Sequence, residues 1–453
     1  MSLFSRPSVF TKSENCPSEV PPTAGRRGTL SPEPPLSATF NEAILASSSS
    51  VRDSLPEQHR EHFETLRQEI IAFAKAHDIP RDTLNKPDAL REAASKLSTP
   101  DLTQLANLFE RFEHLLVKKE PWKNKEALEY AEKFYHLKEQ YDSQFTLLEQ
   151  VGILRDGTIT GIDGKKYPIP TLEQIASRLF ERRETLETKH DQGFTKLLLV
   201  PFGMSLDVLT ETLKQFLLKY KKDNPTFNLN TNQPLWTWEE YQGADIGDSP
   251  KLVYEPRSFD EKDHQGKTKM EILEGQETPG QARGDNGRTG NDDRTGDNGW
   301  RGWTIHLLQP SNLESQDTET PKGFAYIPRK GKGTPQGDEN PRPPLESGKT
   351  PMEYLFTLQE AQDDPHSPYF QESGMTPEDW IIAFMIHLTE TRKPMDNYAN
   401  NTENISYLTG VFFHSSVRVS GAYWDHDGRQ VCLYGRDPCV RNMHMGTRFS
   451  VVV

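Results

Sequence analysis

The side chains of this chain that are best suited to chemistry gather near its C-terminal end, in residues 421–453. An Asp-His-Asp triplet occupies residues 425–427, and Cys432, Cys439 and His444 follow it. Carboxylates, imidazoles and thiolates bind transition metals, so a metal site is one hypothesis for this segment. The triplet, however, has none of the ligand spacings typical of metal sites. We therefore expect no metal and no other cofactor, and a binding surface is the alternative.

The composition of the same segment differs from that of the rest of the chain. The protein is acidic, with a formal net charge of -14. Its last lysine is Lys393 and its last glutamate is Glu403; aromatic residues, arginine, histidine, aspartate and glycine follow. Lysine and glutamate are the usual residues of a solvated surface. A segment without either is more typical of a binding surface than of a solvated tail.

The C-terminal sequence resembles a known signature. The stretch "RVSGAYWDHDGRQVCLYGRDPCVRNMHMGTRF" is similar to the end of the C-type lectin-like fold in formylglycine-generating enzymes and in variable proteins of diversity-generating retroelements. The segments "DGKKYPIPTLEQI", "QGFTKLLLVPFG", "MTPEDWIIAFMIHL" and "ISYLTGVFF" resemble retroelement variable proteins of small-genome bacteria, so the resemblance covers about residues 125–453. The expected structural frame, which combines matching positions with a closing anchor, is Arg418, Gly421, Trp424, Arg436, Asp437, Pro438, Gly446, Arg448 and Phe449.

The two branches of this resemblance differ in their chemistry. Formylglycine-generating enzymes use paired cysteines that bind copper and activate oxygen. An alignment on Gly421 and Trp424 places those cysteines near Asp425 and Gln430, and neither residue is a thiol. A site without thiolates supports neither soft-metal ligation nor thiol chemistry. The sequence therefore predicts that the protein is not an enzyme of this kind, and that its function is binding.

The retroelement branch accounts for the unusual composition. In that family an error-prone reverse transcriptase replaces template adenines, mostly in AAC or AAT codons, and such codons cannot yield Lys, Glu, Gln, Met or Trp. Trp424, Gln430, Met443 and Met445 are therefore expected to belong to the invariant frame. The resemblance implies a surface that binds a protein or another macromolecule. Its candidate diversified positions are Tyr423, Asp425, His426, Asp427, Gly428, Tyr434, Gly435, Asp437, Cys439, Val440, Asn442 and His444. Asp437 also matches the frame, so it is the weakest of them.

The frame residues have physical tasks that suit this interpretation. Trp424 and Phe449 are expected to anchor the loops in the core, and the glycines to permit tight turns or close backbone approach. The three arginines are expected to tie loops down through their forked donors. An ordinary lectin-like domain with a static polar surface remains an alternative, because a fold does not fix a function.

The elements that must position this segment can be read from residue patterns. Residues 1–50 are rich in Ser, Pro and Thr, and we expect them to be disordered. Residues 51–190 carry apolar residues at three- and four-residue spacing, which predicts a helical region with a short hairpin near 155–170. Residues 191–453 predict the C-type lectin-like domain, so the chain as a whole belongs to the α+β class.

Within the predicted domain, two low-complexity or Pro/Gly-rich stretches, residues 275–299 and 310–350, are expected to be flexible insertions. The apolar runs at 196–200 and 448–453 are expected to pair in one sheet. Helices over residues 205–221 and 377–391 should cover that sheet. The second of these has a clear start signal, because Thr376 can cap it and Pro377 suits its first turn.

Composition also limits location and partners. The net charge of -14 argues against general nucleic-acid binding. No apolar run has the length that spans a bilayer, and the first residues do not resemble a secretory signal. Three cysteines cannot form a disulfide framework, so a cytoplasmic location is expected. The helical region is expected to serve oligomerisation or docking, and a scaffold built on that region is the second functional hypothesis.

Overall fold

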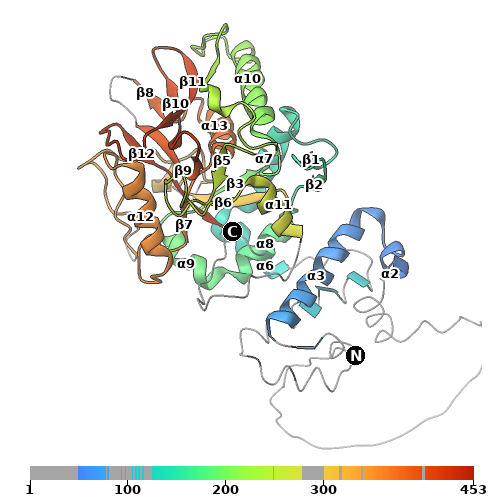
Figure 1. The fold of residues 1–453 in the computed structure, drawn as a ribbon. Helices are drawn as coiled ribbons and strands as arrows, with labels where there is room; N and C mark the ends of the chain where they lie inside the picture. The colour runs from blue at the N-terminus through green and yellow to red at the C-terminus, as the bar shows by residue number, and fades with distance from the viewer. Residues whose placement is uncertain are drawn as a thin grey trace, which may run out of the picture. The chain divides into compact units, whose positions relative to one another are not determined.

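The computed structural model divides the chain into two compact units near residue 122, each described by itself below. The expected disordered tail, apart from residues 49 and 50, and the tract 278–299 lie outside the described residues. The structure describes residues 49–77, 79–80, 93, 97, 105, 108–109, 111–112, 115–116, 125–247, 249–277, 300–315, 319–337, 340–399 and 404–453 (Figure 1).

The first unit is helical and has its own apolar core. Phe63, Leu66 and Ile70 lie on one face of α3 (Arg60–Ala76) and are fully buried. The ring of Phe63 stacks on that of Phe112, with 5.3 Å between the ring centroids. The apolar stripe predicted from the sequence is therefore a core. The helices with described bounds are α2 (Ser49–Asp53), η1 (Glu57–His59) and α3 (Arg60–Ala76).

The second unit begins with four helices and a hairpin. The predicted hairpin is present, with Ile159 opposite Tyr167. Side chains of these helices, such as Leu148 and Leu179, share one core with the sheets that follow. The boundary expected near residue 190 is therefore wrong, because these helices cannot bury their apolar faces without the sheets. The elements are α6 (Lys125–Tyr135), α7 (Leu137–Gln150), β1 (Thr158–Thr160), β2 (Lys166–Pro168), α8 (Leu172–Glu181) and α9 (Arg183–Asp191).

A four-stranded antiparallel sheet joins distant parts of the second unit. The segments at 196–200 and 448–453 do lie in one sheet, as predicted. They are not neighbours, however, because a strand from the middle of the chain lies between them and pairs with both. The strands, in spatial order, are β3 (Lys196–Val200), β6 (Thr304–Leu308), β13 (Phe449–Val452) and β7 (Glu372–Gly374).

The outer edge of β3 is protected by side chains rather than by another strand. Gln140 on α7 accepts a hydrogen bond from the Leu197 N–H (2.9 Å) and donates one to the Thr195 carbonyl (3.0 Å). One helical turn later, Gln144 accepts from the Leu199 N–H (2.9 Å) and donates to the Leu197 carbonyl (2.7 Å). Two buried amides thus satisfy backbone groups that an open sheet edge would leave unpaired.

A seven-stranded sheet carries the C-terminal segment. Its centre is an antiparallel meander of β9, β10 and β11 with a register shift between Val419 and Ser420, which marks a bulge. Shorter strands pair with this meander from both sides. The strands are β4 (Leu235–Thr237), β5 (Leu252–Tyr254), β8 (Asn397–Tyr398), β9 (Ile405–Phe413), β10 (Arg418–Asp425), β11 (Gln430–Arg436) and β12 (Met445–Thr447).

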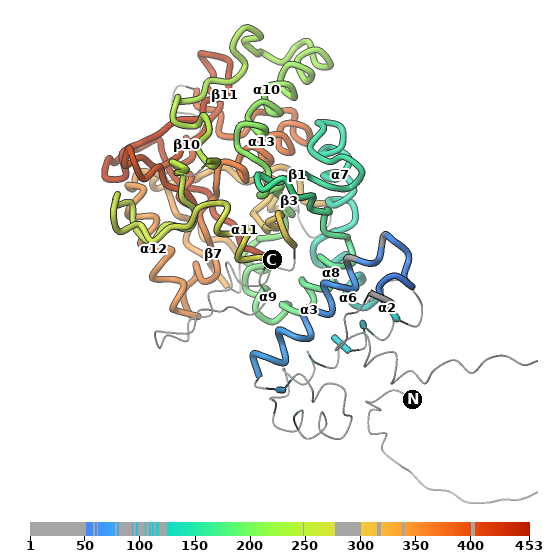
Figure 2. The backbone as a smooth tube through the Cα atoms, turned by 45° about the vertical axis from the view of Figure 1, so that its right-hand side comes forward, coloured from blue at the N-terminus to red at the C-terminus, as the bar shows by residue number. Residues whose placement is uncertain are grey.

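Helix α13 lies between the two sheets. It begins with a capping box in which the Thr376 hydroxyl and the Asp379 carboxylate each accept a backbone N–H, as the sequence predicts. It packs against β3 of one sheet and against β9 and β10 of the other, whereas α10 packs on α13 (Figure 2). The remaining helices are α10 (Leu206–Asp223), η3 (Glu239–Tyr241), α11 (Lys269–Glu277), η4 (Leu313–Ser315), α12 (Pro351–Gln362) and α13 (Pro377–Thr391). None of the described helices is long and apolar enough to cross a bilayer.

The expected flexible insertion at 310–350 is corrected by the structure. Its described residues have little regular structure, yet Phe324, Ile327 and Leu345 are buried. Arg342 is buried as well and forms a bidentate ion pair with Glu372. A high proline and glycine content indicates irregular backbone, but it does not make the segment flexible. The buried side chains and the ion pair hold the segment on the core.

Candidate binding surface

The hairpin of β10 and β11 has two different sides. Trp424 and Leu433 point into the main core, and Trp424 is only 3% exposed. Its ring lies 5.2 Å from that of Phe227 and 6.3 Å from that of Phe384, measured between centroids. Because side chains alternate along a strand, the intervening residues, such as Tyr423, belong to the outer side of the sheet.

The outer side carries a row of rings, which we call the aromatic row: Tyr398, Tyr423, Tyr434 and His444. Tyr423 lies edge-on to Tyr398, with 6.2 Å between the ring centroids, and edge-on to Tyr434 at 5.5 Å. Tyr398 is also 6.0 Å from the His444 ring. The guanidinium of Arg436 lies 4.9 Å above the Tyr434 ring, which is a cation–π contact. Three of the four rings are half-buried, so the row presents ring surface and polar tips to solvent.

Tyr434 is the exception among the candidate diversified positions. It is 6% exposed and packs in a cluster with Tyr407 and Met445, so it is not part of the exposed surface we expected. The Tyr434 ring fits only because the residue opposite it, Gly421, has no side chain. A Cβ at residue 421 would lie 2.6 Å from the Tyr434 ring. Burial raises the pKa of the Tyr434 phenol well above its ordinary value, so the hydroxyl stays protonated.

Gly435 is also a poor position for variation. A Cβ at this residue would lie 2.2 Å from the Trp238 ring, which in turn packs edge-on against Phe413. At Gly428, by contrast, the nearest atom would be the tip of the Asp425 side chain, which can move. The two candidate glycines therefore differ in how much side chain they can accept.

The turn between β10 and β11 presents His426 and Asp427 fully to solvent. Asp425 organises this turn, because its Oδ1 accepts the backbone N–H of Asp427 (3.2 Å) and of Gly428 (3.1 Å). Such a turn is a common task for aspartate. Asp425 is half-buried and has a structural task, whereas the side chains of His426 and Asp427 are exposed.

The loop from Asp437 to His444 holds the remaining candidates. Asp437 accepts the Cys439 N–H (2.9 Å) and Asn442 accepts the His444 N–H (2.9 Å), so both side chains stabilise local turns. Cys439 and Val440 are exposed between these turns. Pro438 is buried, and its carbonyl accepts the N–H of Met352 on α12 (3.2 Å). Met443 is 53% exposed, and its carbonyl accepts the Ser347 hydroxyl (3.0 Å), so its expected place in the invariant frame is not a matter of side-chain burial.

The three frame arginines have different environments. Arg448 is buried and donates to both oxygens of Asp396, with its closest contact at 2.7 Å. Arg418 is half-buried and lies 3.8 Å from Asp437, which is a weak surface pair. Arg436 is exposed, and its guanidinium stacks on the Tyr434 ring. It therefore lies on the outer surface instead of tying down a loop, as we had expected.

The glycine and aromatic frame residues at the end of the chain have clear packing roles. A Cβ on Gly446 would lie 2.5 Å from the Ile327 side chain, so the backbone approaches its neighbour closely, as expected. Phe449 is half-buried at the border of the Tyr434 cluster. The guanidinium of Arg342 lies 5.5 Å above its ring.

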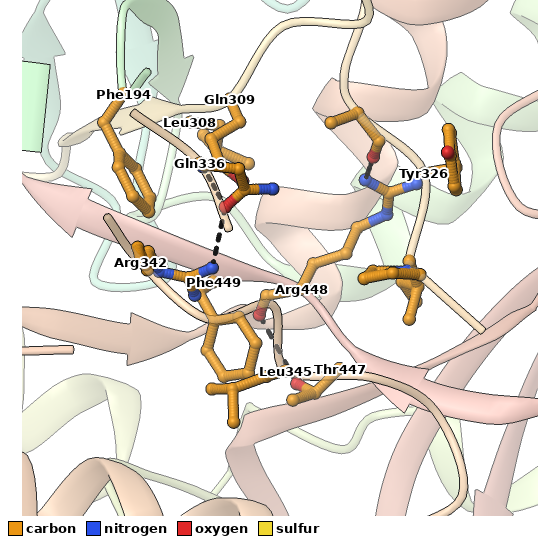
Figure 3. A pocket seen from close by; sticks show the side chains of 13 residues that line it. Phe194, Leu308, Gln309, Tyr326, Gln336, Arg342, Leu345, Thr447, Arg448 and Phe449 are labelled. Carbon is orange, nitrogen blue, oxygen red and sulfur yellow. Dashed lines mark hydrogen bonds between the residues drawn. The ribbon is translucent and has the colours of Figure 1, made fainter. Parts of the chain in front are cut away.

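A small hollow of about 50 Å³ lies beside Phe449 and Arg448 (Figure 3). Two guanidiniums line it, and the Arg342 Nη1 donates to the Gln336 side chain at 3.1 Å. Both arginines already bind carboxylates inside the protein, Arg342 on Glu372 and Arg448 on Asp396. The volume is enough for a few water molecules, and we assign the hollow a structural role.

Cys432 is not an activated thiol. Its side chain is on the outer side of the sheet, opposite Tyr423, but it is only 4% exposed. Burial raises the pKa of the Cys432 thiol to about 11, so at neutral pH it is the unreactive protonated form. Among the residues that the structure describes, no three His, Cys, Asp or Glu side chains converge as a metal site would require.

Sequence reasoning missed three residues that shape this surface. Trp236 on β4 pairs with Cys432 in the sheet and is 39% exposed, which places a large ring on the same side. Tyr398 on β8 completes the aromatic row. Asp396 accepts hydrogen bonds from Arg448, from the Trp380 indole N–H and from the Ser406 hydroxyl. The "LWTW" stretch was a usable signal for Trp236, whereas nothing local distinguishes Asp396.

No family model matches the chain, and no curated protein or solved structure is significantly similar to it.

Proposed function

We propose that the chain is a non-enzymatic, ligand-binding variable protein with a C-type lectin-like domain, whose C-terminal surface is diversified by a retroelement. One observation carries the proposal. All candidate diversified positions except Tyr434 reach solvent, whereas Trp424, Gly446 and Arg448 are buried. A position that accepts many side chains must not have a packing requirement of its own, and the exposed positions His426, Asp427, Cys439 and Val440 meet that condition best, whereas Gly435 does not.

The chemistry of the surface favours a macromolecular partner, with a protein as the first choice. Tyr423, Tyr398 and Trp236 offer large rigid rings with polar edges, and His444 and Arg436 add hydrogen-bond donors beside them. Binding loops of antibodies use the same residue types, because such side chains lose little conformational entropy on binding. These side chains lie on a sheet surface and not in an enclosed cavity, which suits a large partner better than a small molecule.

The second candidate function is a scaffold built on the helical first unit. The separate apolar core of that unit favours this alternative, because it indicates a part that folds around its own interior. Both candidates agree with a cytoplasmic protein. They differ in which region must be changed to abolish binding.

A display experiment tests the proposal. Library A randomises His426, Asp427, Cys439, Val440 and His444 in the full chain, and a control library randomises the same number of exposed positions on α10. Both are selected against a panel of unrelated folded proteins. The proposal predicts folded, specific binders from library A and few from the control library. If both libraries fold equally well and library A yields no more binders than the control, the proposal is wrong.

A further inference from the structure

A buried cluster of three ionisable side chains lies away from the candidate binding surface. The ammonium of Lys269 is 2.5 Å from Asp245 Oδ2 and 2.7 Å from Glu378 Oε1, and all three side chains are 0% exposed. Its third hydrogen bond goes to the Met204 carbonyl (2.8 Å). Lys269 is the first residue of α11, Asp245 follows η3, and Glu378 lies in the first turn of α13. The fold thus brings three distant elements together around one amine.

The surroundings of this cluster are buried and aromatic. The Lys269 Nζ lies 5.3 Å from the Phe202 ring centroid and 5.5 Å from that of Tyr254. The Tyr254 hydroxyl donates to Glu378 Oε1 (2.6 Å), and the Leu206 backbone N–H donates to Asp245 Oδ2 (2.9 Å). Two carboxylates thus share one cation, and Asp245 Oδ1 and Glu378 Oε2 have no hydrogen-bond partner. Buried charges and unpaired oxygens are both costly, so this arrangement calls for an explanation.

We infer that Lys269 and Asp245 join in an intramolecular amide bond, with Glu378 as the group that moves protons. An amine and a carboxyl group held at hydrogen-bond distance in a buried site react as an intramolecular pair, which removes the entropic cost of bringing them together. The product replaces a buried ammonium and a buried carboxylate by one neutral amide. The inference is independent of the proposed binding function.

The reaction balances without any further reactant. The bond from Lys269 Nζ to Asp245 Cγ forms, and the bond from Cγ to Oδ1 breaks. Of the three ammonium hydrogens, one stays on the amide nitrogen and two leave with Oδ1 as water. No oxidation or reduction takes place, so the groups in the site are sufficient.

Each neighbouring group has a task in this condensation. Burial lowers the pKa of Lys269, but Glu378 and Asp245 together hold that pKa above its ordinary value, so the resting form is an ammonium. Glu378, whose Oε1 lies 2.7 Å from Nζ, must therefore take a proton from Nζ to free the lone pair, and a proton must then reach the leaving Oδ1. The Leu206 N–H donates to Oδ2, where negative charge develops during attack.

The bond would close a loop of the chain. Lys269 and Asp245 are 24 residues apart, so the amide would tie the start of α11 to the turn after η3. A covalent tie of this kind restricts the unfolded chain in the same way as a disulfide, but a reductant cannot open it.

Intact mass spectrometry of the denatured full chain tests the inference. The wild type should be lighter by one water than the mass calculated from its sequence, and a protease digest should contain a branched peptide that joins Lys269 to Asp245. The Lys269→Arg and Glu378→Gln variants should have the full calculated mass. Glu378→Gln keeps the shape of the side chain, and circular dichroism should show that this variant is folded.

A matched control comes from a second pair, the buried Lys196 and the partly exposed Glu390, whose charged atoms are 2.7 Å apart. The Glu390→Gln variant should remain one water lighter, as the wild type is. A wild-type chain at full mass, or a water loss that persists in Lys269→Arg, would overturn the bond. A water loss that persists in folded Glu378→Gln would overturn the role of Glu378.

Discussion

The two sides of the β10–β11 hairpin come from the same short stretch of chain but obey different requirements. On the inner side, Trp424 and Leu433 fill the space between the sheet and α13. On the outer side, Tyr423 is half-buried, and the turn that follows reaches solvent. Packing dictates side-chain shape on the first side and leaves it open on most of the second. The comparison teaches that a strand can carry a fixed frame and a changeable surface on alternate residues.

The outer side is itself divided. Tyr434 lies on the last part of β11, where Tyr407 and Met445 restrict it. The next residue, Gly435, belongs to the inner side, and a side chain there would meet Trp238. His426, Asp427 and Val440 lie at turns and loops, where side chains point away from the protein. The changeable surface is therefore centred on the turns and loops, with the tyrosines of the aromatic row beside it as a more constant platform.

The largest loss of stability should come from a substitution on the inner side of the hairpin. Trp424→Ala removes a buried indole that packs on Phe227 and Phe384, and we expect it to lower the free energy of unfolding by about 3–5 kcal/mol. Urea unfolding at neutral pH measures this loss. The Tyr423→Ala variant on the adjacent outer position is the control and should lose clearly less. Equal losses would mean that the two sides of the hairpin do not differ.

Acidic pH should destabilise the protein through a buried histidine on α13, the helix that packs on the inner side of the hairpin. Burial lowers the pKa of His387 on α13 to about 4, and its neutral ring accepts the Phe324 N–H at 2.9 Å. The unfolded chain has a histidine pKa of about 6.5, so it binds the proton first as the pH falls. Because of His387, the free energy of unfolding should therefore fall by about 2–3 kcal/mol as the pH is lowered from 6.5 to 4.

A substitution isolates this contribution. His387→Asn keeps a hydrogen-bond acceptor near the Phe324 N–H but does not titrate in this range. Unfolding free energies of both proteins at pH 7 and pH 4.5 should show a smaller acid loss in the variant. The same acid loss in both proteins would exclude His387 as the cause.

The two candidate glycines provide a sharper test of the comparison, because Gly435 is on the inner side and Gly428 is in the turn. Gly435→Ala forces a Cβ toward the Trp238 ring, and we expect a loss of about 1–3 kcal/mol from the resulting overpacking. Gly428→Ala meets the ends of the Asp425 and Gln430 side chains in an open turn, not a packed ring, and should change stability less. Thermal melts of the two variants make the comparison. If Gly435→Ala is as stable as the wild type, Gly435 belongs with the changeable positions after all.

The smallest change in stability should come from substitutions on the changeable surface. Replacing His426, Asp427, Cys439, Val440 and His444 together by serine should alter the unfolding free energy by no more than about 1 kcal/mol, since four of the five are exposed and unpacked. Binding to any ligand selected on this surface should be lost. Unfolding of this variant would show that the loops are part of the core.

Local signals in the sequence were enough for several of these features. The "TPED" start of α13 and the hairpin at residues 158–168 follow from capping and turn rules that act over a few residues. The burial of Trp424 was expected from the resemblance of the C-terminal sequence. The α+β class followed in the same way. Whether the fold is C-type lectin-like remains a prediction.

Other features depend on contacts between distant residues, which no local pattern reveals. The position of β6 between β3 and β13 is one example, and the glutamines on α7 that protect the edge of β3 are another. Tyr434 has the alternation expected of an outer residue, but Tyr407 and Met445 bury it. The cluster around Lys269 also joins three segments that are far apart in sequence.

The DNA beside the gene tests the central claim most directly. The account predicts a nearby near-copy of the 3′ end of the gene, next to a reading frame for a reverse transcriptase. Differences between the two copies should fall on adenines of the near-copy and should be concentrated in the codons of the exposed positions, such as His426, Asp427 and Val440. The codons of Trp424, Gly446 and Arg448 should be identical in both copies. A gene without such a copy, or differences spread equally over buried and exposed codons, would contradict the account.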